Sequence, residues 1–380
     1  MPAALILLLL LLGAIAAASW LWGRRRSVAL REAESAPVAK ESPAPAVVTE
    51  TAHAVSAREG RVLSAAEVFR KLHELAFGIA SLGTPSPEAL EEIAPITSVV
   101  LDTVATEPRY ALRRPLLLPQ LLRAANDDEV SRRELAKIIA RDPALAGSLV
   151  KLANSPFYRV NERPVESVDR AVALLGTNGI RSLVAAAVMQ PVFKVSDTEF
   201  WRFPEATWEH TYRSAAAAEA HAAIVEDSDP FAAHLLALTM GLGAIVVFRV
   251  VLDVYRARPG LTAEPAVIAS ILDTHTAAVA HRIAQGWDLS GRMLEALEDQ
   301  SPRAEMRQPT SLGKSLYFGR LIGALAVLTS IGVVSDGEAK ASMVAGGTPA
   351  AEFDRMWTRL TGRGEPVGRA SGEPQRRQRT

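Results

Sequence analysis

Residues 118–176 read LPQLLRAANDDEVSRRELAKIIARDPALAGSLVKLANSPFYRVNERPVESVDRAVALLG. Pro143 occupies a first-turn position, and the helix that it starts would bury Leu145, Leu149 and Leu152 on one face. A further helix over 167–175 would stop at Gly176. Because apolar residues recur at helical spacing and no strand-like alternation interrupts them, this stretch predicts an all-α fold.

Two more helices are predicted on the N-terminal side of this stretch. Ser64 and Glu67 form a capping box at the start of a helix over 64–81. After the helix-breaking Pro85 and Pro87, a second helix is predicted over 88–106. We expect the two to form a helical hairpin, residues 61–107, that packs on the main domain. The alternative is a partner-binding helix or a dimer contact.

The segment 244–255, AIVVFRVVLDVY, is rich in β-branched residues and has strand propensity. Arg249 and Asp253, however, stand four residues apart, a spacing at which side chains pair on a helix. Helical patterns surround the segment on both sides. We therefore predict that the helix beginning near Pro230 continues through it.

The composition excludes several classes of chemistry. The chain has 380 residues, no Cys, and 42 basic residues against 42 acidic ones. Without Cys there are no disulfides, thiolate nucleophiles, zinc–cysteine sites or iron–sulfur clusters. A formal net charge of zero gives no general attraction to nucleic acid. No nucleic-acid partner is therefore expected.

The N-terminus carries an uncharged, Leu-rich run over residues 3–22, long enough as a helix to cross a bilayer. Three arginines, Arg24 to Arg26, follow it, and basic residues remain on the cytoplasmic side. Residues 1–23 are thus predicted to be a single transmembrane anchor in the inner membrane, with the N-terminus outside and the body in the cytoplasm. A cleaved signal peptide is the alternative, with residues 16–19 as a cleavage-site mimic.

Two segments lack an apolar period. Residues 24–60 contain scattered Pro, Ala, Glu and Ser, and are predicted to be a flexible linker. Residues 362–380 are rich in Gly, Pro and Arg, and are predicted to be a disordered basic tail. A more specific hypothesis is that this tail contacts anionic lipid or RNA. Of the two, lipid is the more natural partner, given the anchor at the other end of the chain.

Three sequence elements in the opening stretch occur in a characteristic order. They are RDPAL, LANSPFY and the spaced pattern S..RAV.LLG. Their order and spacing resemble the HDOD family, an all-helical relative of the HD metal phosphohydrolases, over about residues 114–331. The resemblance implies an HDOD-like helical domain over 108–332, followed by a C-terminal helical extension over 333–361.

The same resemblance locates the positions of the HD metal ligands. Where HD enzymes have a His-Asp dyad in GLLHDIG, this chain has ALTMGLG, so Met240 and Gly241 replace the dyad. A thioether and a hydrogen atom do not bind a hard divalent ion. His210 in WEHTYRSA and His275 in DTHTAAVAH match family histidines and are expected beside the dyad in a degenerate pocket. No catalytic residue, metal ligand or cofactor is therefore expected.

Asn154 and Ser155 match the recurring Asn-Ser signature of the family. Asn154 is expected to cap the end of the helix that begins at Pro143, and Ser155 to start the turn before Pro156. A partner-facing role for this pair is the alternative.

The resemblance implies a membrane-tethered, non-catalytic regulator that acts through contacts with signalling proteins of unknown identity. The degenerate pocket near His210 and Met240 is a candidate nucleotide sensor. Two other functions are open on the sequence. One is a divergent metal phosphohydrolase acting on nucleotides or cyclic dinucleotides, and the other is a structural protein of the envelope.

Overall fold

The computed structural model describes residues 60–104, 199–302 and 308–361, together with positions 107, 109, 110 and 112 and a few positions between 147 and 189. All of them belong to the second of two compact units, which begins at Val55. Every regular element in these ranges is an α-helix, as predicted. The expected anchor, the tail, Ser155 and most of residues 118–176 lie outside the described residues.

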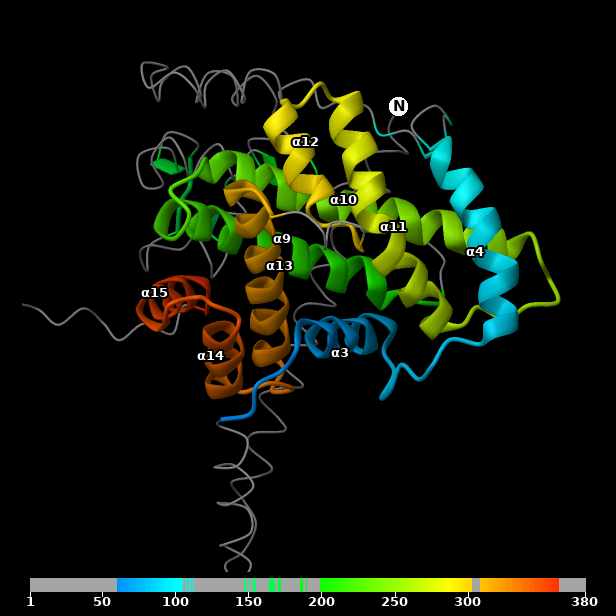
Figure 1. Cartoon of the computed structure of the whole chain (residues 1–380), viewed down its shortest axis with the longest axis horizontal. Helices are drawn as coiled ribbons and strands as arrows, with labels where there is room; N and C mark the ends of the chain where they lie inside the picture. The colour runs from blue at the N-terminus through cyan, green and yellow to red at the C-terminus, as the bar shows by residue number, and fades with distance from the viewer. Residues whose placement is uncertain are drawn as a thin grey trace, which may run out of the picture. The chain divides into compact units, whose positions relative to one another are not determined.

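Helix α10 (Pro230–Arg256) is the centre of the core. It packs against α9 (Arg202–Ile224) and α11 (Pro265–Gly286), and α9 packs in turn against α13 (Ser311–Ser330) (Figure 1). Of the 27 residues of α10, 22 are buried, which explains its apolar, β-branched composition. The helix runs unbroken through 244–255, so the helical prediction for that segment is confirmed.

Helices α9 and α13 approach closely because small residues line their contact. A Cβ atom added to Gly319 would lie 2.5 Å from Cα of Ala218, and one added to Gly323 would lie 2.4 Å from Oγ of Ser214. Both pairs are spaced four residues apart on their helices, so they fall on one face of each. The two backbones therefore meet at a distance that tolerates only hydrogen at positions 319 and 323.

The two N-terminal helices are present but shorter than predicted. Helix α3 (Ala65–Phe77) begins with the expected capping box and ends at Gly78, whose φ of 71° gives a left-handed C-cap. Helix α4 (Pro87–Asp102) follows. Helix α3 packs on α13 and α9, whereas α4 packs on α10 and α11. The two helices of the expected hairpin thus dock on different parts of the core.

Helix α12 (Gly291–Glu298) packs on α11 and α13, and the chain forms two more helices after α13. Helix α14 (Asp336–Ala345) packs on α13. Helix α15 (Ala350–Thr361) packs on α9, α13 and α14 through a buried apolar face of Phe353, Met356, Trp357 and Leu360. The indole N–H of Trp357 donates to Asp336 at 2.8 Å, which ties the two helices together.

Among the described residues, α10 and α13 are long and apolar enough to cross a membrane by length and composition. In the most apolar 18-residue windows of α10 and α13, 89% and 78% of the residues, respectively, are buried inside the body. Core helices have the same property, since burial on all sides favours an apolar sequence.

A substitution at the α9–α13 contact would test how much this contact contributes to the stability of the core. Gly319→Ala should lower the free energy of unfolding by about 1–3 kcal/mol, because the new methyl group would overlap the backbone of Ala218. Gly286→Ala is the matched control, since Gly286 is an exposed helical position with open space around it. Urea unfolding at fixed pH measures both. Equal stability of the two variants would contradict the close contact.

Candidate functional site

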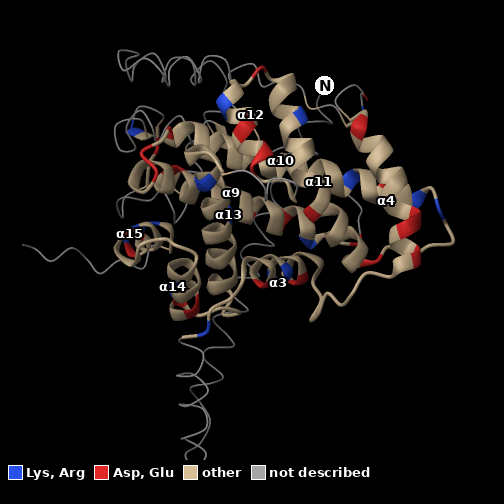
Figure 2. Cartoon of the chain, in the orientation of Figure 1, with Lys and Arg blue, Asp and Glu red and all other residues tan. Residues whose placement is uncertain are grey.

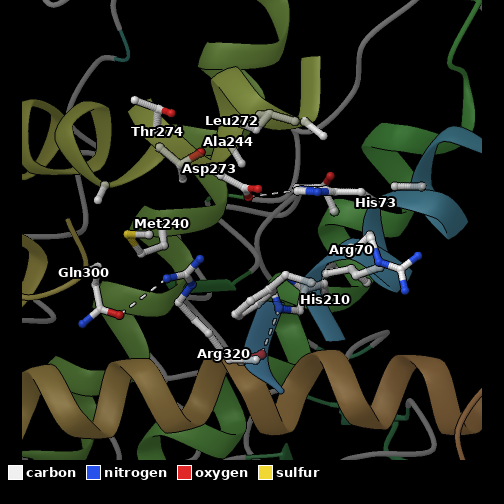
Figure 3. Close-up of a pocket in the computed structure, with 18 of the residues that line it drawn as sticks. Arg70, His73, His210, Met240, Ala244, Leu272, Asp273, Thr274, Gln300 and Arg320 are labelled. Carbon is white, nitrogen blue, oxygen red and sulfur yellow. Dashed lines mark hydrogen bonds and ion pairs between the residues drawn. The ribbon is translucent and has the colours of Figure 1, made fainter. Parts of the chain in front are cut away.

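A pocket of about 1070 Å³ opens between helices α3, α9, α10, α11 and α13 (Figure 3). Its wall is mainly apolar, with Phe69, Ala237, Met240, Ala244 and Leu272. Charged and titratable side chains project into it from four of the helices and from the loop after α12. This volume is at the upper end of the range of about 300–1000 Å³ that is usual for small-molecule sites.

His210 lies on the pocket face of α9, as the sequence predicts. Its Nε2 is 3.0 Å from the backbone oxygen of Arg320 on α13, and because that oxygen can only accept, Nε2 carries the proton. The ring also meets Phe69 edge-on, with centroids 6.3 Å apart. Burial lowers the pKa of His210 to about 4, although the bond to the carbonyl opposes this shift. At neutral pH the imidazole is therefore uncharged.

Met240 and Gly241 line the pocket from α10, and His210 lines it from α9. The neighbour of Gly241 is Thr211, the residue that follows His210 on α9. A Cβ atom at position 241 would stand 2.1 Å from Oγ1 of Thr211, whose hydroxyl donates to the backbone oxygen of Thr207. With threonine at position 211, no room is left between α9 and α10 for a side chain at 241.

Arg320 projects from α13 into the pocket, a placement that the sequence analysis did not predict. Its guanidinium lies 5.3 Å from the ring centroid of Phe69, and one nitrogen donates to Oε1 of Gln300 at 3.5 Å. No carboxylate of the described residues lies within 4.0 Å of it. Burial lowers the pKa of Arg320, and the nearby charge of Asp273 opposes that shift. In the sequence, only its position directly after Gly319, on the face of α13 near α9, could have pointed to this placement.

His73 on α3 and Asp273 on α11 face each other across the opposite wall of the pocket (Figure 3). Nε2 of His73 is 3.8 Å from the Asp273 carboxylate, whose side chain is 65% exposed. Burial lowers the pKa of His73 and raises that of Asp273, while their mutual attraction opposes both shifts. Neither residue was predicted, since they lie 200 positions apart in the sequence.

The expectation that His275 shares this pocket is wrong. Asp273 and Ala277 line the pocket from α11, but His275 is not among the lining residues. Its sequence neighbours Thr274 and Thr276 do line the pocket, whereas His275 lies near the charges of Arg282 and Asp102. There burial lowers its pKa, with the charge of Arg282 acting in the same direction and that of Asp102 against it.

The residues at 299 and 300 serve the loop that leads into α13. Asp299 accepts from the backbone N–H and the hydroxyl of Thr310, at 2.8 and 2.7 Å. The amide of Gln300 donates to the backbone oxygens of Ala296 and Gly313 at 3.2 and 3.0 Å. Across the part of the chain that the structure describes, no group of three or more His, Cys, Asp or Glu side chains could hold a metal ion.

Asn154, the first residue of the Asn-Ser signature, joins two segments away from the pocket residues. Its side-chain amide donates to the backbone oxygens of Val150 and Val165, at 2.9 and 2.7 Å. Its oxygen accepts from the N–H of Val165 at 2.7 Å. The contact with Val150, four residues earlier, is that of a helix C-cap, and the pair of bonds to Val165 closes the loop that follows.

The neutral state of His210 should make the fold sensitive to acid. An unfolded histidine has a pKa near 6.5, so between pH 6.5 and 4 the unfolded chain binds more protons than the folded one. Stability from this residue is therefore fully present above pH 6.5 and is lost as the pH falls towards 4. Replacing His210 by Gln should reduce the loss of unfolding free energy between pH 7 and pH 5 by about 2 kcal/mol. Urea titrations at the two pH values would measure it, and an unchanged loss would contradict a buried neutral ring.

Three comparisons place the chain among known proteins. The HDOD domain model matches residues 113–302, half of the chain. An uncharacterised protein of Treponema pallidum (strain Nichols) is 25% identical over 186 residues, 46% of this chain. Those residues are 34% of that relative, so the chain spans about a third of its length.

Two solved structures are also similar. An HDOD domain protein of unknown function from Geobacter sulfurreducens shares 17% identity, with a TM-score of 0.46 over 72% of this chain and 97% of that one. A protein of Shewanella amazonensis SB2B, provisionally named a metal-dependent phosphohydrolase, shares 18% identity, with a TM-score of 0.48 over 72% and 99%. Since the family model covers half of the sequence, the chain belongs to the HDOD domain family.

Proposed function

We propose that this protein is a membrane-anchored, non-catalytic HDOD regulator that acts through contacts with other signalling proteins. The observation that carries the non-catalytic part is the crossing of α9 and α10 at Gly241. An aspartate there would have to occupy the space of the Thr211 side chain. HD enzymes are expected to carry the Asp of their dyad at this position. In this chain the Thr211 side chain takes up that space.

The surroundings of His210 also bear on metal binding. Nε2 of His210 carries a proton and donates to the backbone oxygen of Arg320, so Nδ1 is the one ring nitrogen with a lone pair for a ligand. Met240, its neighbour across the pocket, is 3% exposed and offers only a thioether, a ligand for soft metals. The side chains at these positions therefore do not fit a hard divalent ion.

The membrane part of the proposal rests on the sequence of residues 1–26. An uncharged run followed at once by three arginines favours a retained anchor with the body in the cytoplasm. The linker 24–60 would let the helical body stand away from the bilayer, and the basic tail 362–380 would reach anionic lipid. Basic and acidic residues are interspersed over the described helices rather than gathered in a basic face, which supports a protein partner over nucleic acid (Figure 2).

Elemental analysis would test the non-catalytic assignment. The full-length chain, purified in mild detergent without chelators or a polyhistidine tag, should contain no stoichiometric divalent metal. It should also leave bis(p-nitrophenyl) phosphate intact when Mn²⁺ is added. A tightly held stoichiometric metal that is lost in His210→Ala would instead establish the divergent phosphohydrolase.

Fractionation would test the anchor. The full-length chain should remain in the membrane pellet after extraction with alkaline carbonate, because a spanning helix is held by burial in hydrocarbon. A chain lacking residues 1–26 should move to the supernatant. The chain with Arg24, Arg25 and Arg26 changed to Gln is the matched control, and should stay in the pellet, because the apolar run is intact. Release of the full-length chain by carbonate would refute a spanning segment.

A further inference from the structure

Eight large apolar side chains are exposed in the part of the chain that the structure describes, and three of them gather at one end of the body. They are Val62, Ile331 and Val333, whose surfaces are 53%, 50% and 45% exposed. Val62 precedes α3, and the other two belong to the turn between α13 and α14. Figure 1 shows the first described residues passing this turn, and the N–H of Leu63 donates to Oγ of Ser342 on α14 at 2.8 Å. We call the three exposed residues the apolar tip.

The turn that carries Ile331 and Val333 is fixed at both ends. At the end of α13, the N–H of Val333 donates to the backbone oxygen of Leu328 at 3.0 Å. This bond, together with the left-handed φ of 76° at Gly332, is that of a Schellman motif. Ser335 then begins α14 with a capping box. The two aliphatic side chains are therefore held at the surface by a hydrogen-bonded backbone.

The charged side chains around the apolar tip are already engaged within the protein. Arg61 pairs with Glu67 at 3.0 Å, and Lys340 pairs with Asp354 at 2.6 Å. Asp336, at the start of α14, accepts the indole N–H of α15 at 2.8 Å. The partner that fits this end of the body is therefore apolar rather than charged.

The size and composition of the apolar tip distinguish between apolar partners. A stable protein interface buries about 800 Å² on each partner and is centred on aromatic or arginine side chains. Three half-exposed aliphatic side chains provide much less area, and they include no aromatic ring. A bilayer accepts single aliphatic side chains at its acyl boundary without a complementary surface. The tip therefore fits a lipid surface better than a second copy of this chain.

The place of the tip in the chain also favours a bilayer. Val62 comes directly after the predicted linker 24–60, which leads back to the apolar run over residues 3–22. A flexible linker of this length would have an end-to-end distance of roughly 35 Å. Because such a tether keeps the body at a high effective concentration beside the bilayer, even a weak apolar contact would be occupied. The end of the body nearest to the tether would meet the bilayer most often.

We propose that the apolar tip inserts into the interfacial layer of the bilayer that anchors the chain, so that the body rests on the membrane by this end. This inference rests on the proposed membrane anchor. The contact would turn α4 and α12, which lie away from the tip in Figure 1, towards the cytoplasm. Signalling proteins would then reach the body from that side.

Fluorescence quenching of the full-length chain in phosphatidylcholine vesicles tests the proposal. Because the chain has no Cys, Val62→Cys and Val99→Cys each provide a single site for a bimane label. Val99, on α4, is the matched control and is 68% exposed. With nitroxide groups on the lipid acyl chains, quenching at position 62 should exceed that at position 99 by about threefold or more, because an apolar contact lies about 5–10 Å deep at the acyl boundary.

Charged substitutions test the tip itself. Ile331→Asp together with Val333→Asp should lower the quenching at position 62 by about half or more, because a carboxylate resists transfer into apolar surroundings. Val99→Asp, in the chain labelled at position 62, should leave that quenching unchanged. Thermal unfolding shows that each variant is folded, as expected for substitutions at exposed positions.

Three results would overturn the proposal. One is quenching at position 62 that does not exceed quenching at position 99, and another is a folded double variant that is quenched like the unaltered chain. The third is quenching that appears only with anionic lipid, since the basic tail would then make the contact. If nitroxide on a second copy of the chain quenches position 62 and lipid nitroxide does not, the tip is a self-association surface instead.

The outcome can be separated from that of the proposed function. Quenching is measured before the vesicles are extracted with alkaline carbonate, and retention after extraction reports on the anchor. If the chain is retained but position 62 is not quenched, the tip fails while the anchor stands. If position 62 is quenched but the chain is then released, the tip contacts lipid while the spanning anchor fails.

Discussion

Helix α9 lies against both α10 and α13 at distances set by residues that have almost no side chain. Gly241 of α10 meets Thr211, and Gly319 and Gly323 of α13 meet Ala218 and Ser214. These contacts fix the three helices relative to one another, because helices packed this closely cannot shift or tilt without atoms overlapping. The positions of the pocket residues follow from this arrangement.

The same close approach connects the two sides of the pocket. Because α13 lies so near α9, the backbone oxygen of Arg320 comes within 3.0 Å of His210. A histidine in that position satisfies a carbonyl of the neighbouring helix, and the side chain of the same Arg320 extends over Phe69 into the pocket. Arg320 of α13 thus accepts a hydrogen bond from His210 with its backbone oxygen and places a charged side chain in the pocket.

The helical class, the capping box at Ser64 and the unbroken α10 could be predicted from the sequence because each depends on local spacing. His210, Met240 and Gly241, which the resemblance to the family brought together, all line the pocket. His275 was misplaced, because a family match gives the position in the chain but not the side of the helix that faces the cavity. His73 and Asp273 could not be paired from sequence, since their contact depends on where α3 docks.

The proposed loss of the dyad at Met240 and Gly241 would have to be accommodated by packing. Removing a carboxylate from a metal site leaves a cavity lined by groups that were held by the ion, and such a cavity costs stability unless the structure closes on it. Here Thr211 fills the space beside Gly241 and hydrogen-bonds within its own helix, to Thr207 at 2.6 Å. The filled space is therefore local to Gly241. The rest of the pocket stays open, and the Arg320 side chain extends into it against the Phe69 ring.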